Sequence, residues 1–406
     1  MNNEPPIGYK EALALVLETV SPLKGDQELD LADSLGRILS RDLYSRVDSP
    51  SINASMKDGY AVLSHEVRHA TPDNGVQLKI TGTAAAGQQP GHDLTPGTAI
   101  RILSGARVPS GADAVLSEEF ATRQEDLLTV FNTAKPGRNI LPQGTDVRAG
   151  EMIATCGSRL NPGTIGTLVA AGHGTVPVFH LPRIAIVATG DELVIPGQPL
   201  PEGKLYASNM AMVRAWCLKY GMPTDVSILG DSPEAITTKI REKLATHDAV
   251  LTCGGAWTGD RDFVARTLDA LGWKCLFHRI RMGPGKAVGF GMKDHKPIFL
   301  LPGGPPSNLT AFLQIALPGL LRLGGADQPG LPRITVKLCH ELTSRDITWT
   351  QFVYGKLTEE DGHTLFTPLK LASRLQSLAR ADGAVAIPEG LKTLRSGAMV
   401  RAQLLF

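Results

Sequence analysis

The sequence has few cysteines and lacks any C-x-x-C pair. Its five cysteines (Cys156, Cys217, Cys253, Cys275 and Cys339) lie far apart. An odd, scattered set supports neither a disulfide framework nor a thiolate zinc site, and a reducing compartment is the simple interpretation. No run reaches 18 apolar residues, and the first 20 residues carry acidic side chains where a signal peptide has Lys or Arg. We therefore expect a soluble, cytoplasmic protein with no membrane partner.

The chain also lacks an excess of charge of either sign. Lys and Arg number 41 and Asp and Glu number 40, which leaves a formal net charge of +1 at pH 7. This balance gives no long-range field that would steer the chain to nucleic acid or anionic lipid. Any anion-binding site must therefore be local, and we expect no nucleic-acid partner.

Glycine, proline and apolar residues are all plentiful. Gly (43) and Pro (28) make up about 17% of the 406 residues, against an average near 12%, and 42% of the residues are hydrophobic. Such a composition excludes disorder and indicates a globular chain rich in turns. At roughly 150 residues per domain, the length predicts two to four domains.

Changes of pattern along the chain predict four regions. Residues 1–45 and 140–180 form a framework, in which residues 8–43 hold two short amphipathic helices. Residues 46–139 form an inserted β-rich module with strands near 76–80, 98–103 and 127–131. Residues 181–326 form an α/β domain, and residues 327–406 form a β-barrel or sandwich with one short helix near 371–379.

The α/β region shows the clearest alternation. Apolar strands are expected at 183–189, 224–229, 249–253 and 297–301, with helices at 208–220, 232–244, 261–271 and 307–321. Ser208 or Asn209 would cap the first helix, and Ser232 followed by Pro233 would start the second. Near-continuous apolar strands linked by helices predict a doubly wound parallel sheet.

Glycines and polar residues follow three of these strands. The loops contain Gly190 with Asp191 and Glu192, then Gly254 and Gly255 with Asp260 and Asp262, then Pro302 and Gly303 with Ser307. In an open parallel sheet, ligands bind beyond the carboxyl ends of the strands, and glycine lets backbone N–H groups approach a phosphate. The three loops together predict one anion pocket.

The same loops contain acidic residues, which has to be explained because carboxylates repel a phosphate. A hard cation such as Mg²⁺ would bridge Asp191, Glu192, Asp260 and Asp262 to the ligand. The alternative is helix capping, since Asp260 and Asp262 stand where acids stabilise the first turn of a helix.

Basic residues supply the opposite charge. Arg279, Arg281 and Lys286 surround a Pro-Gly turn before the last strand of the sheet, and Lys286 is the best candidate for an anion contact. Arg279 and Arg281 fit a solvated strand face equally well.

Two loops of the inserted module carry polar residues that simple turns would also explain. One contains Asp58 before Gly59, and the other contains Ser104 before Gly105.

Ordered motifs extend along nearly the whole chain. They are residues 55–62 (SMKDGYAV), 102–106 (ILSGA) with Val108-Pro109, 189–193 (TGDEL) with Pro196-Gly197 and Pro199-Leu200, Gly254-Gly255 followed by Gly259 and Asp262, Pro284-Gly285-Lys286, and Leu301-Pro302-Gly303 with Pro305 and Ser307. In this order they resemble the molybdopterin molybdenumtransferase family, which includes bacterial MoeA and the E domain of gephyrin.

The resemblance implies the four regions named above, with a molybdopterin-binding α/β domain, and an elongated homodimer. It implies a reaction in which molybdenum (or tungsten) from molybdate enters adenylylated molybdopterin and AMP is released with a divalent cation, Mg²⁺. Asp58, Glu192 and Asp262 match family site residues and would serve as catalytic and metal-binding groups, with Lys286 as a further catalytic residue. In the dimer, Asp58 and Ser104 would meet the sheet loops of the other subunit, and molybdoenzymes or other proteins of the cofactor pathway would be partners.

The chain departs from the family pattern at several positions. Ala207 stands where the family has Asp, Trp257 where it has a small Ser, Gly283 where it has Lys, and Gly304 and Pro306 where it has Asn and Val. A non-catalytic carrier of molybdopterin or of the finished cofactor is therefore an alternative. A molybdopterin adenylyltransferase that uses only the α/β domain is a third, against which the inserted module and the barrel argue.

Overall fold

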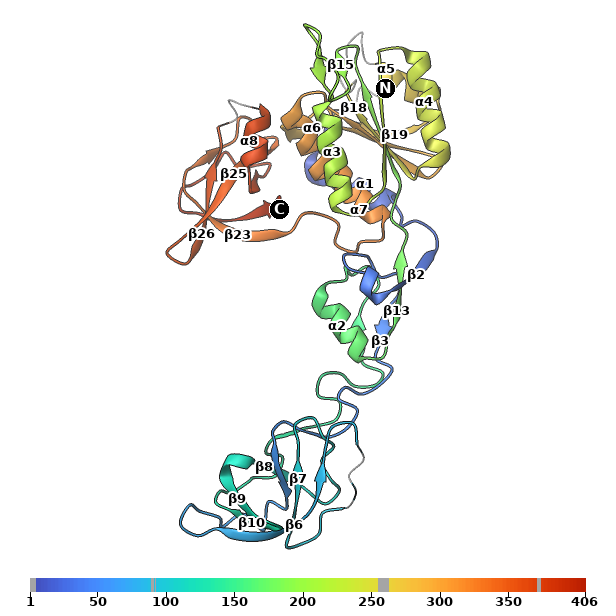
Figure 1. Ribbon diagram of the computed structural model, residues 1–406. Helices are drawn as coiled ribbons and strands as arrows, with labels where there is room; N and C mark the ends of the chain where they lie inside the picture. The colour runs from blue at the N-terminus through green and yellow to red at the C-terminus, as the bar shows by residue number, and fades with distance from the viewer. Residues whose placement is uncertain (1–4, 89–90, 92, 255–262, 371–373) are drawn as a thin grey trace. The chain divides into compact units, whose positions relative to one another are not determined.

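The computed structural model describes residues 5–406 apart from 89–90, 92, 255–262 and 371–373 (Figure 1). The chain divides into two compact units. The first comprises Met1–Gln27, Gly157–Arg159 and Phe179–Phe406, and the second comprises Glu28–Cys156 and Leu160–Val178.

A six-stranded sheet forms the centre of the α/β domain in the first unit. Its order is β17-β14-β18-β22-β21-β19. The first four strands are parallel: β17 (Thr224–Leu229), β14 (Ile184–Thr189), β18 (Ala249–Cys253) and β22 (Lys296–Leu301). Two further strands were not predicted: β21 (Gly289–Lys293) pairs antiparallel with β22, and β19 (Lys274–His278) pairs antiparallel with β21. The doubly wound parallel fold is confirmed for the strands that were predicted.

Helices cover both faces of this sheet, as every residue of β14 and β18 is buried. Figure 1 shows α3 (Ser208–Lys219) and α6 (Pro305–Ala311) on one face, with α4 (Pro233–Thr246) and α5 (Phe263–Ala270) on the other. A π-helical turn over Phe312–Ala316 follows α6 and leads into α7 (Leu317–Leu323), where one continuous helix was expected. Pro318 in the first turn of α7 cannot donate an N–H to the preceding turn, which accounts for the irregular segment.

The start of α4 was predicted correctly and the start of α3 was not. Ser232 caps α4, because its Oγ accepts a hydrogen bond from the Ala235 N–H at 3.3 Å. In α3 the cap position belongs to Ala207, which offers no side-chain acceptor. Asn209 lies inside the helix, and its amide binds the Gly303 carbonyl instead.

Five strands close into a C-terminal barrel, as expected. The ring runs β25-β26-β23-β29-β27 and returns to β25, and β20 and β1 extend its sheet beyond β25. The strands are β23 (Arg333–Leu338), β25 (Thr350–Glu360), β26 (His363–Pro368), β27 (Gly383–Ile387), β29 (Met399–Leu404), β20 (Ile280–Gly283) and β1 (Ile7–Gly8). A short pair, β24 (Leu342–Thr343) with β28 (Thr393–Leu394), and helix α8 (Arg374–Arg380) complete this part.

The β-rich module lies in the second unit and forms a six-stranded sheet in the order β8-β5-β7-β6-β10-β9. Its core includes Leu78, Leu116 and Leu128, all buried. The strands are β5 (Gly59–Val62), β6 (Val76–Ala84), β7 (Thr98–Ile102), β8 (Ala114–Ser117), β9 (Ala121–Gln124) and β10 (Leu127–Val130).

Further short elements lie in the second unit. They are β3 (Leu43–Tyr44) with β12 (Met152–Ala154), β4 (Ala54–Ser55) with β11 (Ile140–Leu141), β2 (Asp26–Asp30) with β13 (Thr175–Phe179), and α2 (Pro162–Ala170). Two of them, β2 and β13, also include residues of the first unit.

Of the two N-terminal helices expected, only α1 (Tyr9–Thr19) forms, in the first unit. The prediction of a second helix is wrong, since Leu31–Asp33 makes a single 3₁₀ turn. Gly36 has φ +76°, a left-handed conformation that interrupts the helical spacing of the leucines on either side.

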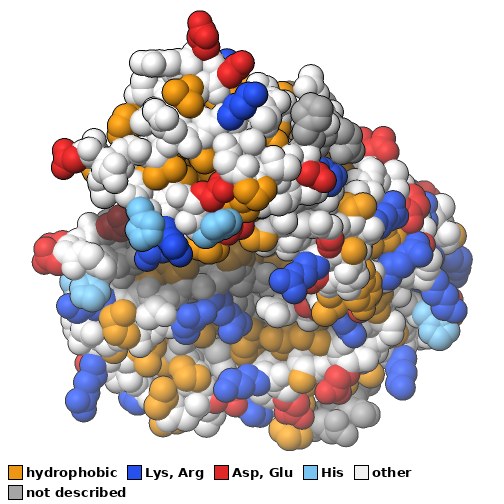
Figure 2. Space-filling model, turned by 90° about the horizontal axis from the view of Figure 1, so that it is seen from below, with side chains coloured by type: hydrophobic (Ala, Val, Ile, Leu, Met, Phe, Trp, Pro, Cys, Tyr) orange, Lys and Arg blue, Asp and Glu red, His pale blue; other side chains and the backbone are white. Residues whose placement is uncertain are grey.

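The charged side chains of the protein are mixed in sign. Figure 2 shows basic and acidic side chains interspersed on the face drawn. Among the described residues, no helix combines the length and apolar character needed to cross a lipid bilayer.

Candidate functional site

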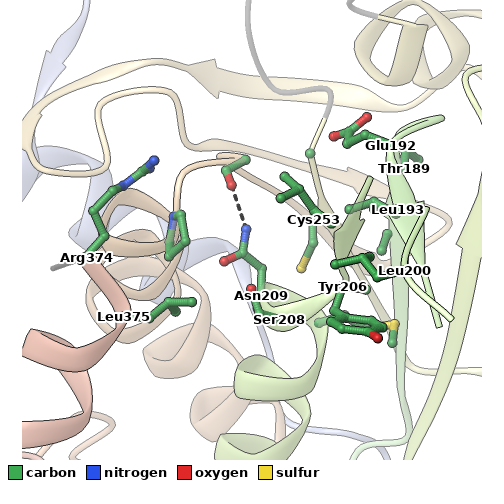
Figure 3. A pocket seen from close by; sticks show the side chains of 17 residues that line it. Thr189, Glu192, Leu193, Leu200, Tyr206, Ser208, Asn209, Cys253, Arg374 and Leu375 are labelled. Atoms are coloured by element: carbon green, nitrogen blue, oxygen red, sulfur yellow. Dashed lines mark hydrogen bonds between the residues drawn. The ribbon is translucent and has the colours of Figure 1, made fainter. Parts of the chain in front are cut away.

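A cavity of about 720 Å³ opens at the carboxyl ends of β14, β18 and β22 (Figure 3). Two short strands, β15 (Leu193–Val194) and β16 (Leu205–Tyr206), and the starts of α3, α6 and α8 complete its wall. The lining residues are Ala188, Thr189, Glu192, Leu193, Leu200, Leu205, Tyr206, Ala207, Ser208, Asn209, Met210, Cys253, Gly254, Gly303, Pro305, Arg374 and Leu375. Of the predicted site residues, the structure brings Glu192, Gly254 and Gly303 together here.

Hydrogen bonds connect the loops at the bottom of this cavity. The Gly254 N–H donates to the Leu301 carbonyl at 3.1 Å, so the loop after β18 is tied to the end of β22. Asn209 Nδ2 donates to the Gly303 carbonyl at 2.7 Å, which joins α3 to the loop after β22 (Figure 3). Hydrogen bonds of backbone groups and of the Asn209 side chain therefore join three segments at the cavity floor.

Two buried oxygens at the cavity have no hydrogen-bond partner among the described residues. They are Thr189 Oγ1, on a side chain at the end of β14, and Asn209 Oδ1. Leaving a buried polar atom unpaired costs free energy, and native proteins almost always satisfy such groups. Both residues line the cavity, so a ligand or water held there can supply the missing partner.

Cys253 forms part of the cavity wall as a neutral thiol. Its side chain is buried, and burial raises the pKa of the thiol to about 12. A thiol with this pKa is protonated at neutral pH, so Cys253 provides apolar surface and no nucleophilic thiolate.

The described lining of the cavity holds one side chain of each charge. Glu192 is the one acidic residue and Arg374 the one basic residue in the described lining. Figure 3 shows them on opposite sides of the bond between Asn209 and Gly303. No described residue pairs with the Glu192 carboxylate, which folds over Gly190: a Cβ on Gly190 would stand 2.6 Å from Glu192 Oε2.

Three other predicted residues of these loops do not line the cavity and contact other parts of the protein: Asp191, Pro302 and Ser307. Asp191 Oδ1 accepts the Asp231 N–H at 3.0 Å, and the Asp191 carbonyl accepts Lys204 Nζ at 2.6 Å. The Pro302 carbonyl accepts Asn308 Nδ2 at 2.9 Å. Ser307 lies half-buried in α6, where its carbonyl oxygen is 3.3 Å from the position a Cβ would take on Gly285.

The three predicted cations lie outside the lining as well. Arg281 belongs to β20, where its guanidinium binds the Pro6 carbonyl at 2.6 Å and Glu389 Oε2 at 3.3 Å. Arg279 precedes this strand with φ +73°. Lys286 is exposed in the turn that packs against α6, the helix whose first residue, Pro305, lines the cavity.

Asp58 and Ser104, the predicted residues of the β-rich module, meet within the second unit. Asp58 Oδ1 accepts the Ser104 N–H at 2.6 Å, and both side chains are exposed. The Gly105 N–H donates to the Ser55 carbonyl at 2.8 Å, so the two loops form one surface. Asp58 thus presents a carboxylate to solvent, with one oxygen held by the backbone.

Gly255 and Asp262, together with Trp257 and Asp260, lie outside the described residues. Within the described part of the chain, no cluster of three His, Cys, Asp or Glu side chains could hold a metal ion. Mg²⁺ is commonly held by one or two carboxylates with the remaining ligands from water and substrate phosphates. Glu192, a carboxylate at the cavity that no described residue pairs with, fits that kind of site.

Four further residues line the cavity and were not predicted as site residues: Thr189, Asn209, Cys253 and Arg374. Thr189 is the first residue of the 189–193 motif and Asn209 was considered only as a helix cap, so only their buried oxygens without a described partner mark them as site residues. Arg374 is about 70 residues beyond the end of β22, and no local pattern connects it to the sheet.

The fold and the cavity define a ligand-binding α/β domain joined to a β-barrel and to a separate β-rich module. Three family models match the chain: the MoeA N-terminal region (domain I and II) over residues 7–172, a probable molybdopterin binding domain over 185–322, and the MoeA C-terminal region (domain IV) over 341–405.

Known proteins resemble the chain over almost its full length. A molybdopterin molybdenumtransferase of Nostoc sp. is 30% identical over 97% of this chain and 92% of its own length. The corresponding protein of Staphylococcus epidermidis is 28% identical over 97% and 94%. A crystal structure of the molybdopterin biosynthesis MoeA protein of Pyrococcus horikoshii covers 98% of this chain and 99% of its own, with 31% identity and a TM-score of 0.80. The chain belongs to the molybdopterin molybdenumtransferase (MoeA) family.

Proposed function

We propose that this protein inserts molybdenum from molybdate into adenylylated molybdopterin and releases AMP. As a member of its family it is a transferase of molybdenum cofactor biosynthesis. The observation that carries the proposal is the cavity at the carboxyl ends of β14, β18 and β22. Two buried oxygens there, Thr189 Oγ1 and Asn209 Oδ1, have no hydrogen-bond partner among the described residues. Its volume of about 720 Å³ falls in the range of small-molecule sites.

The cavity suits a ligand that has both a flat ring system and charged groups. Leu193, Leu200 and Leu205 give one wall an apolar surface, and the neutral Cys253 thiol adds to it. The Thr189 hydroxyl and the Asn209 carbonyl oxygen can accept N–H groups, which a pterin or adenine ring carries. These residues bind and orient the substrate.

Cleavage of the phosphoanhydride beside molybdate brings several negative charges together, so the site must offset them. We assign Glu192, with Asp262, to hold Mg²⁺, which when bound neutralises phosphate charge as a Lewis acid. Lys286 adds a positive charge beside α6, and backbone N–H groups of the glycine loops add their dipoles.

The protein acts as a homodimer in this proposal, with Asp58 and Ser104 of one subunit completing the cavity of the other. Support comes from the Asp58 loop, which holds an exposed carboxylate whose Oδ1 is fixed by the Ser104 N–H at 2.6 Å. Asp58 would then act as a third metal-binding or catalytic carboxylate. We further propose that the protein works in the cytoplasm, supplying the cofactor pathway and its molybdoenzymes.

Incubation of the purified chain with adenylylated molybdopterin, molybdate and Mg²⁺ tests the proposal, with AMP followed by chromatography. We expect AMP release that depends on molybdate. Tight binding of the nucleotide without AMP release would replace the proposal with a carrier function, and absence of binding would overturn both.

A further inference from the structure

The cavity has a positive end that comes from the C-terminal part of the chain. Arg374 is the first residue of α8 and the one basic residue in the described lining. No described carboxylate forms an ion pair with it, whereas Arg281, for example, is held by Glu389. An arginine at a cavity, with no acidic partner in the described part of the chain, is available to a ligand.

Gly304 makes the room that this side chain occupies. A Cβ on Gly304 would stand 2.5 Å from Arg374 Nη2, well inside van der Waals contact. The backbone of Gly304 has φ −77° and ψ 129°, which any residue can adopt. Glycine is therefore needed here for the position of Arg374 and not for the conformation of the loop.

The cavity has open space at the residue before Gly304. Gly303, which precedes Gly304, lines the cavity, and a Cβ built on it meets no atom of the described residues within 4 Å. A ligand group of a few atoms can therefore lie beside Gly303 and within reach of Arg374.

We propose that Arg374 binds a tetrahedral oxyanion of the substrates, seated beside Gly303, and that Gly304 sets the position of its guanidinium. The inference rests on the proposed function and names one subsite of it. A planar guanidinium donates two parallel N–H bonds to two oxygens of one phosphate or molybdate, a geometry that lysine does not reproduce. Glu192, the proposed cation ligand, lies on the other side of the cavity, so the oxyanion subsite at Arg374 and the cation site are distinct (Figure 3).

Two variants and their combination test the subsite: R374Q, G304A and the double variant. Arg380 is the matched control, because it is an exposed arginine at the other end of α8 and does not line the cavity. Titration calorimetry with molybdate alone and with inorganic phosphate alone separates the two sources of oxyanion. The KM for molybdate and kcat of AMP release are measured in parallel, and melting temperature reports folding.

We expect R374Q to weaken binding of at least one oxyanion by about tenfold, with an unchanged melting temperature and R380Q equal to wild type. G304A should reproduce this loss by displacing the guanidinium, and adding G304A to R374Q should cause no further loss. R374K should recover only part of the affinity. The probe that loses affinity identifies the oxyanion as molybdate or as a phosphate of the nucleotide.

Wild-type affinity for both oxyanions in R374Q, or binding of neither by the wild-type protein, would overturn the inference. Independent effects of G304A and R374Q would overturn the role of Gly304. If wild-type protein binds an oxyanion through Arg374 but releases no AMP, the proposed reaction fails and the subsite stands. If AMP release proceeds and R374Q leaves it unchanged, the subsite fails and the reaction stands.

Discussion

Gly254 passes so close to Thr189 that a Cβ on Gly254 would stand 2.6 Å from the Thr189 carbonyl oxygen. Gly254 also has φ +108°, a conformation that side chains rarely adopt. The ends of β14 and β18 can therefore approach each other at the cavity floor only because this residue is glycine.

Gly254→Ala should lower the free energy of unfolding by about 2–4 kcal/mol, because it adds both a clash with backbone and a strained φ. Gly303→Ala is the matched control in the same cavity, since its Cβ meets no described residue within 4 Å, and we expect a change below about 0.5 kcal/mol. Urea unfolding followed by circular dichroism measures both. Equal stability of the two variants would contradict the close approach.

Glu192→Gln should reduce AMP release by about 100-fold or more while leaving the melting temperature within a few degrees, because the exposed carboxylate contributes to the site and not to packing. Glu202→Gln makes the same chemical change at an exposed residue outside the lining. We expect it to behave as wild type. Full activity of Glu192→Gln would remove Glu192 from the chemistry.

Asp225 in β17 should contribute a stability that acid removes. Lys243 Nζ lies 2.7 Å from Asp225 Oδ2, and this hydrogen bond holds the pKa of Asp225 below its usual 3.8. Because the folded pKa is depressed, the stabilisation is present above about pH 4 and is lost as the pH falls through the folded value.

At pH 6, Asp225→Asn should cost about 1 kcal/mol, a figure discounted because the Asp225 side chain is about half exposed to solvent. Unfolding free energies of both proteins measured from pH 6 to 2 should converge at the acid end. A difference that stays constant to pH 2 would contradict the assigned interaction.

Local sequence patterns predicted the secondary structure correctly where one or two residues determine it. Ser232 followed by Pro233 marks the start of α4, because the cap and the proline each satisfy a requirement of the first turn. The leucine spacing after Leu31 was not enough to predict the structure there. Gly36 adopts a positive φ, and its N–H donates to the carbonyl of Leu160, a residue far along the chain that the local pattern does not reveal.

The site residues that come directly after a strand of the sheet could be predicted from the sequence. Glu192, Gly254 and Gly303 follow three parallel strands, so topology alone gathers them. The sequence also made Arg281 a candidate site residue. Arg281 belongs to β20, however, which pairs with β25 of the barrel, and the Arg281 guanidinium binds Glu389 and the Pro6 carbonyl. Arg374 enters the cavity from α8, a contact that only tertiary packing creates.

A mixing experiment with two inactive variants tests the central claim most directly. Asp58→Asn and Glu192→Gln should each abolish most AMP release, and the two proteins are mixed under conditions that exchange subunits. If the Asp58 of one subunit serves the Glu192 cavity of the other, each mixed dimer holds one intact site and one doubly altered site, and the mixture should regain about a quarter of wild-type activity. Glu192→Gln mixed with Lys286→Gln, both in the α/β domain, should regain none. Absence of recovery in the first mixture, with subunit exchange verified, would contradict a site shared between two subunits.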